Sequence, residues 1–225
     1  MVEHVARRTL AANEVNRVVF AVPEGQEDDV LAEYVTHHLG LAVHRGPVDD
    51  VLCRFAIAIA AEDPSIVVRV TADDPLKDPA LIDRAVRTLV DDPTVDYVSN
   101  TLDATFPEGL DVEAIRVEAL LLADREAVLP SDREHVTPFI WRQPDRFTIR
   151  QFRADRDLSD WRWTLDTVED ANFLSDVLNH FPTGPATYRY QDVVAMLESH
   201  PDLLAGMPRV PRGAAYLAMK EAERT

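Results

Sequence analysis

The chain has 225 residues, and its 40 Asp and Glu residues outnumber its 23 Lys and Arg residues, which gives a formal net charge of −17 at pH 7. A surface this acidic repels phosphate backbones and anionic lipid headgroups, so the composition argues against binding to nucleic acid or to a membrane surface. With 46% hydrophobic residues the chain can bury a large core, and its length suits one large α/β domain, alone or with a small appendage.

Cysteine content and hydropathy point to the cytoplasm. The one cysteine, Cys53, excludes an internal disulfide framework and every zinc ribbon built from cysteines. No apolar run approaches the ~20 residues that a membrane helix needs, and residues 1–4 have no basic and apolar signal pattern. These features predict a cytoplasmic protein.

Short apolar runs alternate with segments of helical periodicity along the first hundred residues. The apolar run SIVVRV is the strongest expected strand, and proline favours a helix start at position 79. The expected helices are residues 2–12, 26–39, 49–61 and 79–90, and the expected strands are residues 17–22, 41–43, 65–70 and 95–98. This alternation predicts a mostly parallel sheet covered by helices on both faces.

The regular alternation of expected strands and helices ends after residue 100. Residues 101–109 form a loop with proline and glycine, a candidate lip of a binding site. The later expected helices are residues 117–127, 132–142, 168–179 and 191–199, and the later expected strands are residues 110–115, 146–152 and 162–165. Proline and glycine in residues 181–186 indicate a linker, so we expect an α/β domain over residues 1–180 and a C-terminal helical extension over residues 181–225.

Two of the expected strands end in aspartate. Residues 65–70 are followed by TADDP, with Asp73 and Asp74 adjacent, and residues 162–165 are followed by Asp166. Open parallel sheets bind ligands at the carboxyl ends of their strands, so carboxylates from two such ends could bind Mg²⁺ together with waters and phosphate oxygens. The alternative is structural, with the first pair starting a turn before the proline and Asp166 capping the next helix.

Several catalytic motifs are absent from the sequence. The seven glycines form neither a GxGxxG dinucleotide loop nor a GxxxxGK[ST] phosphate loop. The seven histidines include no HExxH zinc pair, and no GxSxG nucleophile elbow occurs. Cys53 lies among apolar residues of an expected helix, so we interpret it as a core residue rather than a nucleophile.

Two further acidic segments have both a functional and a structural interpretation. Arg133 and His135 lie in SDREHVTP, where the serine and glutamate could instead form a helix capping box. Asp111 and Glu113 alternate with apolar residues at strand spacing, which places both carboxylates on one face of a strand. That face could equally be solvated surface.

Five segments of the chain share their order and residue types with one known family. They are HRGPVDDVLCRF (residues 44–55), VRVTADDPLKDPALID (68–83), DYVSNTLDATFPEGLDVE (96–113), DREHVTPFI (132–140) and TLDTVED (164–170). Together they resemble the cytidylyltransferases of the spore-coat-polysaccharide and flagellin-modification type, which belong with the CMP-Kdo and acylneuraminate cytidylyltransferases. The resemblance implies a nucleotide-diphospho-sugar-transferase (GT-A-like) α/β fold. It also implies the reaction of CTP with an acidic sugar to give a CMP-sugar and pyrophosphate, for surface polysaccharide or glycan synthesis.

The resemblance implies roles for individual residues. Asp73 and Asp166 fall on the family's metal-binding aspartates, with Mg²⁺ as the cofactor, and Asp50 and Arg54 fall in the segment that approaches the nucleotide. The residues in segments that would line the sugar pocket are Asn100, Asp111, Glu113, Arg133 and His135. The arginine of this group could pair with a sugar carboxylate through its planar fork.

The chain departs from the family at its start. The family opens with a strand and a phosphate loop that has an Arg and a Leu-Pro-Gly-Lys signature, whereas residues 1–5 align with the helix that follows. We therefore expect the fold to lack this first strand and loop, and we attribute the difference to a misassigned start. The alternative function is a catalytically inactive sugar-binding or assembly partner that has lost the nucleotide loop. The resemblance also implies, more loosely, a homodimer.

Overall fold

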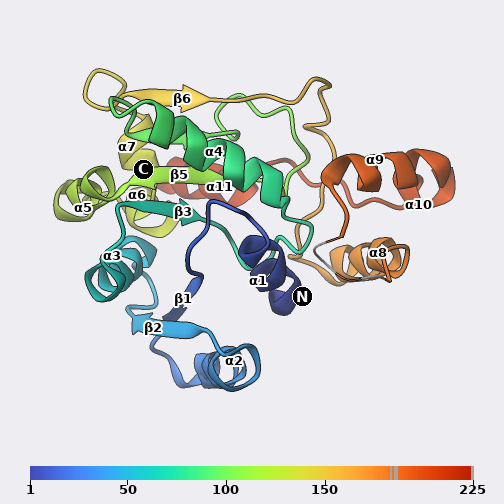
Figure 1. The fold of residues 1–225 in the computed structure, drawn as a ribbon, viewed down its shortest axis with the longest axis horizontal. Coiled ribbons are helices and arrows are strands. Elements are labelled where there is room, and N and C mark those ends of the chain that lie inside the picture. Colours follow the sequence, from blue (N-terminus) through green and yellow to red (C-terminus); the bar gives the residue numbers. More distant parts are fainter. Residues whose placement is uncertain (183, 185–186, 224–225) are drawn as a thin grey trace.

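A computed structural model describes residues 1–182, 184 and 187–223 of the chain. Helices and strands alternate through its first half (Figure 1). The strands are β1 (Val19–Pro23), β2 (Ala42–Gly46), β3 (Ile66–Arg69), β4 (Tyr97–Ser99), β5 (Glu113–Arg116) and β6 (Ile149–Gln151). The helices are α1 (Val2–Leu10), α2 (Asp29–Tyr34), α3 (Val51–Glu62), α4 (Pro79–Asp91), α5 (Val117–Glu126), α6 (Pro130–His135), α7 (Pro138–Trp141), α8 (Val168–Asn179), α9 (Tyr190–Ser199), α10 (Pro201–Ala205) and α11 (Ala214–Ala222). A 3₁₀ turn at Gln26–Asp28 and a π turn at Val35–Leu39 flank α2.

The strands form two sheets. β1 and β2 pair in parallel, and the other four strands are ordered β3-β5-β4-β6. β6 is parallel to β4, whereas β5 is antiparallel to both β3 and β4, so three of these four strands point the same way. The expected α/β fold with a mostly parallel sheet is confirmed. Within the described residues β1 and β3 each pair with a single strand, and the expectation that the family's first strand is missing stays a prediction.

Two clusters of buried side chains lie on opposite faces of the four-stranded sheet. Successive side chains of a strand point to opposite faces. Tyr97 of β4 therefore packs with α3 and α5 on one face, and the next residue, Val98, packs with α4 on the other. In β5, Ile115 lies on the same face as Tyr97, and Ala114 lies on the same face as Val98. The expected cover of helices on both faces is confirmed.

Side chains at the helix starts explain where two of these helices begin. The carboxylate of Asp50 accepts a hydrogen bond of 2.8 Å from a backbone N–H in the first turn of α3. Asp78 caps α4 in the same way, also at 2.8 Å, and Pro79 occupies the first turn, where its missing N–H has no consequence. Both helices begin within two residues of the position expected from the sequence.

Residues 132–142, expected as one helix, form the two short helices α6 and α7. Proline has no N–H to donate to the helical hydrogen-bond series, so the helix is interrupted ahead of Pro138. Val136, at the break, has a φ of +71°. The capping box considered for this segment is not formed, because the N-cap of α6 is Leu129 and Ser131 lies inside the helix.

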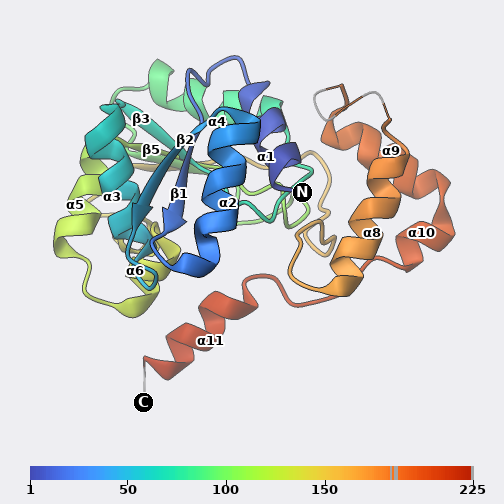
Figure 2. The same ribbon diagram turned by 90° about the horizontal axis from the view of Figure 1, so that it is seen from below.

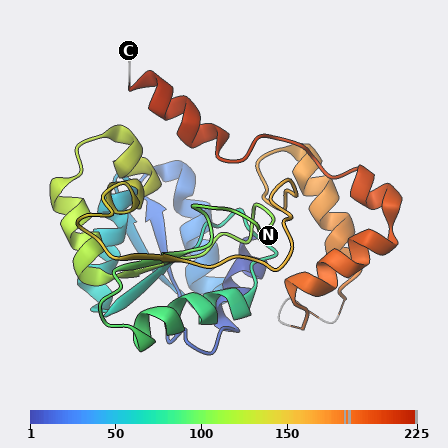
Figure 3. The same cartoon turned by 90° about the horizontal axis from the view of Figure 1, so that it is seen from above.

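Helices α8, α9 and α10 lie together at one end of the molecule, while α11 lies apart from them and packs against α6 (Figures 2 and 3). Residues 206–213, here called the C-terminal strap, connect α10 to α11. The expected strand at residues 162–165 is reduced to one parallel bridge, from Arg162 to Glu108. The expected linker at residues 181–186 lies partly outside the described residues, and the domain boundary there stays a prediction. None of the helices in the described ranges is long and apolar enough to cross a membrane.

Candidate active site

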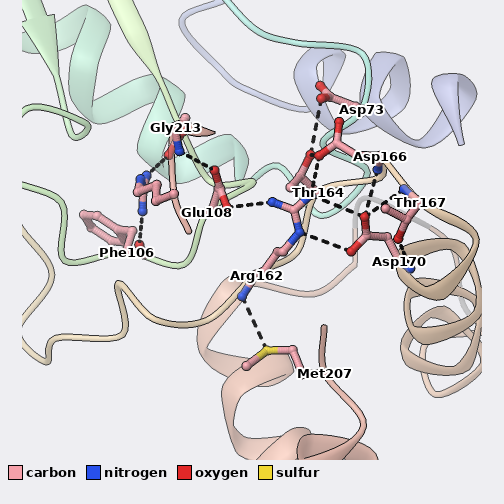
Figure 4. Close-up of polar contacts among 12 residues, drawn as sticks. Asp73, Phe106, Glu108, Arg162, Thr164, Asp166, Thr167, Asp170, Met207 and Gly213 are labelled. Carbon is pink, nitrogen blue, oxygen red and sulfur yellow. Dashed lines mark hydrogen bonds and ion pairs between the residues drawn. The ribbon is translucent and has the colours of Figure 1, made fainter. Parts of the chain in front are cut away.

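Two segments that are far apart in the sequence meet beside Asp73. The backbone N–H of Leu165 donates to the carbonyl oxygen of Asp73 at 2.9 Å. The hydroxyl oxygen of Thr164 lies 3.2 Å from Asp73 Oδ2 and 3.4 Å from Asp166 Oδ2, so it is within hydrogen-bond reach of both carboxylates (Figure 4). The structure therefore brings together the two aspartates that were predicted as metal ligands.

The adjacent aspartates Asp73 and Asp74 have different surroundings. Asp74 is buried, and its Oδ2 atom accepts from the Thr71 hydroxyl at 2.8 Å and from the Lys77 ammonium at 2.7 Å. Lys77 is fully buried, so this ion pair is part of the core. Asp73 is half-buried, and its Oδ1 atom accepts no hydrogen bond from any residue the structure describes. Asp74 thus has the structural role that was the alternative to metal binding, whereas Asp73 is available to a ligand.

The helix cap next to Asp166 is formed by its neighbour. The Thr167 hydroxyl accepts from the Asp170 N–H at 3.1 Å, and the Asp170 carboxylate accepts from the Thr167 N–H at 2.9 Å, which is a complete capping box for α8. The side chain of Asp166 lies outside this box and is 54% exposed. Asp166 therefore does not cap α8.

The donor set of Asp73 and Asp166 fits Mg²⁺. This ion prefers oxygen ligands and usually takes only one or two protein carboxylates, with waters and substrate phosphates as its other ligands. The Oδ1 atoms of both residues accept no hydrogen bond from the described part of the chain. No third His, Cys, Asp or Glu among the described residues completes a metal-binding group with them. The pair is thus suited to a cation shared with a phosphate-bearing substrate.

The two predicted nucleotide-binding residues fix the start of α3. Asp50 caps the helix through the N–H of Cys53, as described above. Arg54 is buried, and its Nη1 atom donates to the carbonyl oxygens of Pro47 and Val48 at 2.6 and 2.7 Å. Both side chains therefore set the shape of the loop that precedes α3. Direct contact with a nucleotide stays a prediction for both.

Arg133, predicted in the sugar pocket, pairs with a residue predicted for the nucleotide. Its Nη2 atom lies 2.7 Å from Asp50 Oδ2 and 2.8 Å from Asp124 Oδ1, and its Nε atom donates to Asp50 at 2.9 Å. Burial favours the neutral guanidine, but these hydrogen bonds outweigh it and raise the pKa of Arg133. A sugar carboxylate would have to displace Asp50 or Asp124 to pair with this arginine.

Asn100 and Glu113 are buried and have protein partners for their polar atoms. The Asn100 amide donates to one backbone carbonyl at 2.9 Å and accepts from one backbone N–H at 2.8 Å, which fixes the segment leading into β5. Glu113 accepts from Arg69 at 2.6 Å, from Tyr97 at 2.5 Å and from Thr137 at 2.6 Å. Direct contact of either residue with a sugar stays a prediction.

Asp111 and His135 contact the C-terminal residues. Asp111 forms an ion pair with Arg212, and the His135 ring packs edge to face on Tyr216 with ring centroids 5.2 Å apart. Burial raises the pKa of Asp111 to about 6, although Arg212 opposes this shift. Burial and the charge of Arg69 lower the pKa of His135. Its Nε2 atom is buried with no hydrogen-bond partner among the described residues, so it could bind a polar ligand group.

Arg162 is the residue of this site that sequence reasoning missed. It is buried beside Asp166 and pairs with Asp166, Asp170 and Glu108 (Figure 4). The capping box of Thr167 and Asp170 could have been read from the sequence, because Thr and Asp three residues apart precede an apolar run. No local pattern connects Arg162 with Glu108, since their contact depends on the tertiary fold.

Comparison with known proteins finds one family. Residues 1–196 match the family described as Cytidylyltransferase. The spore coat polysaccharide biosynthesis protein SpsF of Bacillus subtilis is 27% identical over 209 residues, which cover 90% of this chain and 83% of that protein. A 3-deoxy-manno-octulosonate cytidylyltransferase of Geotalea uraniireducens is 36% identical over 100 residues, which cover 42% of this chain and 37% of that protein.

The similarity extends to a solved structure. A cytidylyltransferase from Leptospira borgpetersenii superposes with a TM-score of 0.85 at 26% sequence identity, over 93% of this chain and 87% of that chain. The fold and family expected from the five sequence segments are thus confirmed. Because the family match spans most of its length, the chain belongs to the cytidylyltransferase family of nucleotidyltransferase enzymes.

Proposed function

We propose that the protein is a Mg²⁺-dependent cytidylyltransferase that joins CTP to an acidic sugar and releases pyrophosphate, making a CMP-sugar for surface polysaccharide or glycan synthesis. The observation that carries this proposal is the approach of Asp73 and Asp166 across the Thr164 hydroxyl. Family membership supports cytidylyl transfer. The name of one relative, a spore coat polysaccharide biosynthesis protein, supports a role in polysaccharide synthesis, and the name of another, a 3-deoxy-manno-octulosonate cytidylyltransferase, supports a sugar acid as the acceptor.

In this reaction a sugar hydroxyl attacks the α-phosphorus of CTP and loses its proton to solvent, the bond from that phosphorus to the oxygen bridging to the β-phosphate breaks, and pyrophosphate leaves. Asp73 and Asp166 would hold the cation through their Oδ1 atoms. When bound, Mg²⁺ offsets the negative charge on the phosphate oxygens. The Thr164 hydroxyl lies between the two carboxylates and can donate its one proton to either of them.

We assign the sugar contacts to His135 and Asp111. His135 has a buried ring nitrogen without a partner among the described residues, and Asp111 pairs with Arg212 through Oδ1 only, which leaves Oδ2 without a partner among those residues. Asn100 and Glu113 are not assigned sugar contacts, since the polar atoms of both are already engaged by protein partners.

Pyrophosphate release tests the proposal. The assay contains the full chain, MgCl₂, one nucleotide and one member of a panel of eight-carbon and nine-carbon acidic sugars, and it compares CTP with UTP, ATP and GTP. We expect release with CTP and at least one acidic sugar. A preference for another nucleotide contradicts cytidylyl transfer. No release by the folded protein with any pair is the result that an inactive binding partner would give.

A further inference from the structure

One buried arginine lies at the centre of the acidic group beside the proposed metal site. The side chain of Arg162 is 6% exposed, and its guanidinium contacts three carboxylates (Figure 4). Nη1 lies 2.9 Å from Glu108, Nε lies 3.2 Å from Asp170, and Nη2 donates to Asp166. The planar fork of an arginine can bind several acceptors in fixed directions at once, which an ammonium group cannot do.

Arg162 donates to one oxygen of Asp166, and the Thr164 hydroxyl lies near that same oxygen. Oδ2 accepts from the guanidinium and lies within hydrogen-bond distance of the hydroxyl, whereas Oδ1 has no hydrogen-bond partner among the described residues. A carboxylate held by one oxygen presents the other in a defined direction. Partners of this kind orient the ligands of metal ions and maintain metal affinity.

The other two carboxylates prevent Arg162 from moving with Asp166. Asp170 is 1% exposed and is fixed by the capping box of α8. The second oxygen of Glu108 accepts from the N–H of Gly213 at 3.3 Å, so Glu108 also contacts the C-terminal strap. Arg162 is thus anchored from two sides, while the side chain of Asp166 is 54% exposed and has Arg162 as its ion-pair partner.

We propose that Arg162 is a positioning residue for Asp166: it holds Oδ2 so that Oδ1 faces the divalent cation. This inference rests on the proposed function, because it requires Asp73 and Asp166 to be the metal ligands. In the proposed role, Arg162 acts only through Asp166 and contacts neither CTP nor the sugar.

The variant Arg162→Lys separates geometry from charge. Lysine keeps the positive charge near the cation but cannot reach Glu108, Asp166 and Asp170 together. If charge alone mattered, the metal affinity would stay unchanged. If Arg162 orients Asp166, the variant should bind the metal about 10- to 100-fold more weakly, which is the usual effect of losing a partner that orients a metal ligand.

The experiment is a titration of the full chain with Mn²⁺ alone, in which electron paramagnetic resonance measures the free ion. It compares the wild type, Arg162→Lys, Asp166→Asn and the matched control Arg116→Lys. Arg116 donates to backbone carbonyls at the end of α4 and in the loop before β4, so its loss also removes several internal hydrogen bonds. We expect weaker binding for Arg162→Lys and Asp166→Asn, and wild-type affinity for Arg116→Lys.

The outcomes distinguish this inference from the proposed function. Wild-type affinity in Arg162→Lys, together with weak binding in Asp166→Asn, overturns the positioning role and leaves the metal site intact. An equal loss in Arg116→Lys also overturns it, because the effect would then be general. Failure of the wild type to bind Mn²⁺, or unchanged binding in Asp166→Asn, refutes the metal site and this inference with it.

A second variant covers the case in which Arg162→Lys does not fold. Glu108→Gln weakens one anchor of Arg162, and Asp160→Asn makes the same charge change at an exposed position of a neighbouring loop. We expect weaker Mn²⁺ binding in Glu108→Gln than in Asp160→Asn. Equal affinities in these two variants overturn the positioning role.

Discussion

Asp73 and Asp166 are the single residues on which the proposed chemistry depends most. Replacing either by asparagine keeps the shape of the side chain and removes the negative charge that binds the cation. We expect kcat for pyrophosphate release to fall about 100-fold or more, as when a group that stabilises transition-state charge is lost. The control is Glu169→Gln, which removes an exposed carboxylate from the first turn of α8. Full kcat in Asp73→Asn or Asp166→Asn would contradict their role.

Asp111 makes stability depend on pH. Its pKa is about 6 in the folded protein and near 4 in an unfolded chain. The folded state therefore binds this proton more tightly, and ionisation of Asp111 lowers the free energy of unfolding as pH rises from about 4 to 6. Urea denaturation between pH 4 and 7 should show the wild type losing stability relative to Asp111→Asn across this window. A difference that does not vary with pH would contradict this prediction.

The sequence predicted the site residues unevenly, for a physical reason. Asp73 and Asp166 each follow an apolar run, and the ends of such runs converge in an α/β fold, so their meeting could be foreseen. Resemblance to a family indicates which segment lies near a pocket but not which way each side chain points. Asn100 and Glu113 lie in the predicted segments, but their polar atoms form hydrogen bonds with other protein groups. Arg162 is buried through contacts that no local pattern encodes.

Among the secondary-structure elements, α8 is the helix whose start is most directly linked to the site. Thr167→Ala removes the cap of α8 and should lower the free energy of unfolding by about 1 kcal/mol. Thr167→Ser keeps a hydroxyl at the same place and should retain most of that stability. Urea denaturation of both variants measures the effect. Equal losses in the two variants would show that the hydroxyl is not the stabilising group.

Helix α11 contacts the body through the aromatic side chain of Tyr216 and through Glu223 at its C-cap, which accepts from the Ser131 N–H at 2.7 Å. Tyr216 packs edge to face on His135 and on Trp141, the latter with ring centroids 5.8 Å apart. Each such contact contributes about 0.5–1.5 kcal/mol. Tyr216→Ala should therefore speed amide hydrogen exchange in α11 by roughly tenfold, measured by mass spectrometry. The control is Leu217→Ala, because Leu217 is 59% exposed. Comparable acceleration in the control would contradict docking through Tyr216.

Elements with strong local signals were predicted best. Helix α8 has the predicted bounds, and α4 begins at the predicted proline. Two predictions failed. The local effect of Pro138, which divides one expected helix into α6 and α7, was overlooked, and tertiary structure leaves residues 162–165 with one bridge instead of a strand. The reversed direction of β5 was also not foreseen, because strand direction follows from chain connections rather than from the residues of the strand.

At the scale of the whole molecule, the net charge of −17 opposes the approach of CTP, which is itself an anion. Salt screens this repulsion, since the Debye length falls from about 30 Å at 0.01 M to about 8 Å at 0.15 M ionic strength. We expect kcat/KM for CTP, at constant free Mg²⁺, to rise as KCl is added over this range. A steady decline would contradict the prediction and indicate a local positive field at the nucleotide site.

The proposed chemistry depends on a divalent cation held between Asp73 and Asp166. The most direct measurement is a crystal structure with Mn²⁺ and CTP, using anomalous scattering at the manganese absorption edge to locate the ion. We predict one strong anomalous peak about 2.1 Å from a carboxylate oxygen of each aspartate and next to the phosphates of CTP. A peak that contacts neither aspartate, with CTP bound in the crystal, would contradict the proposed metal site.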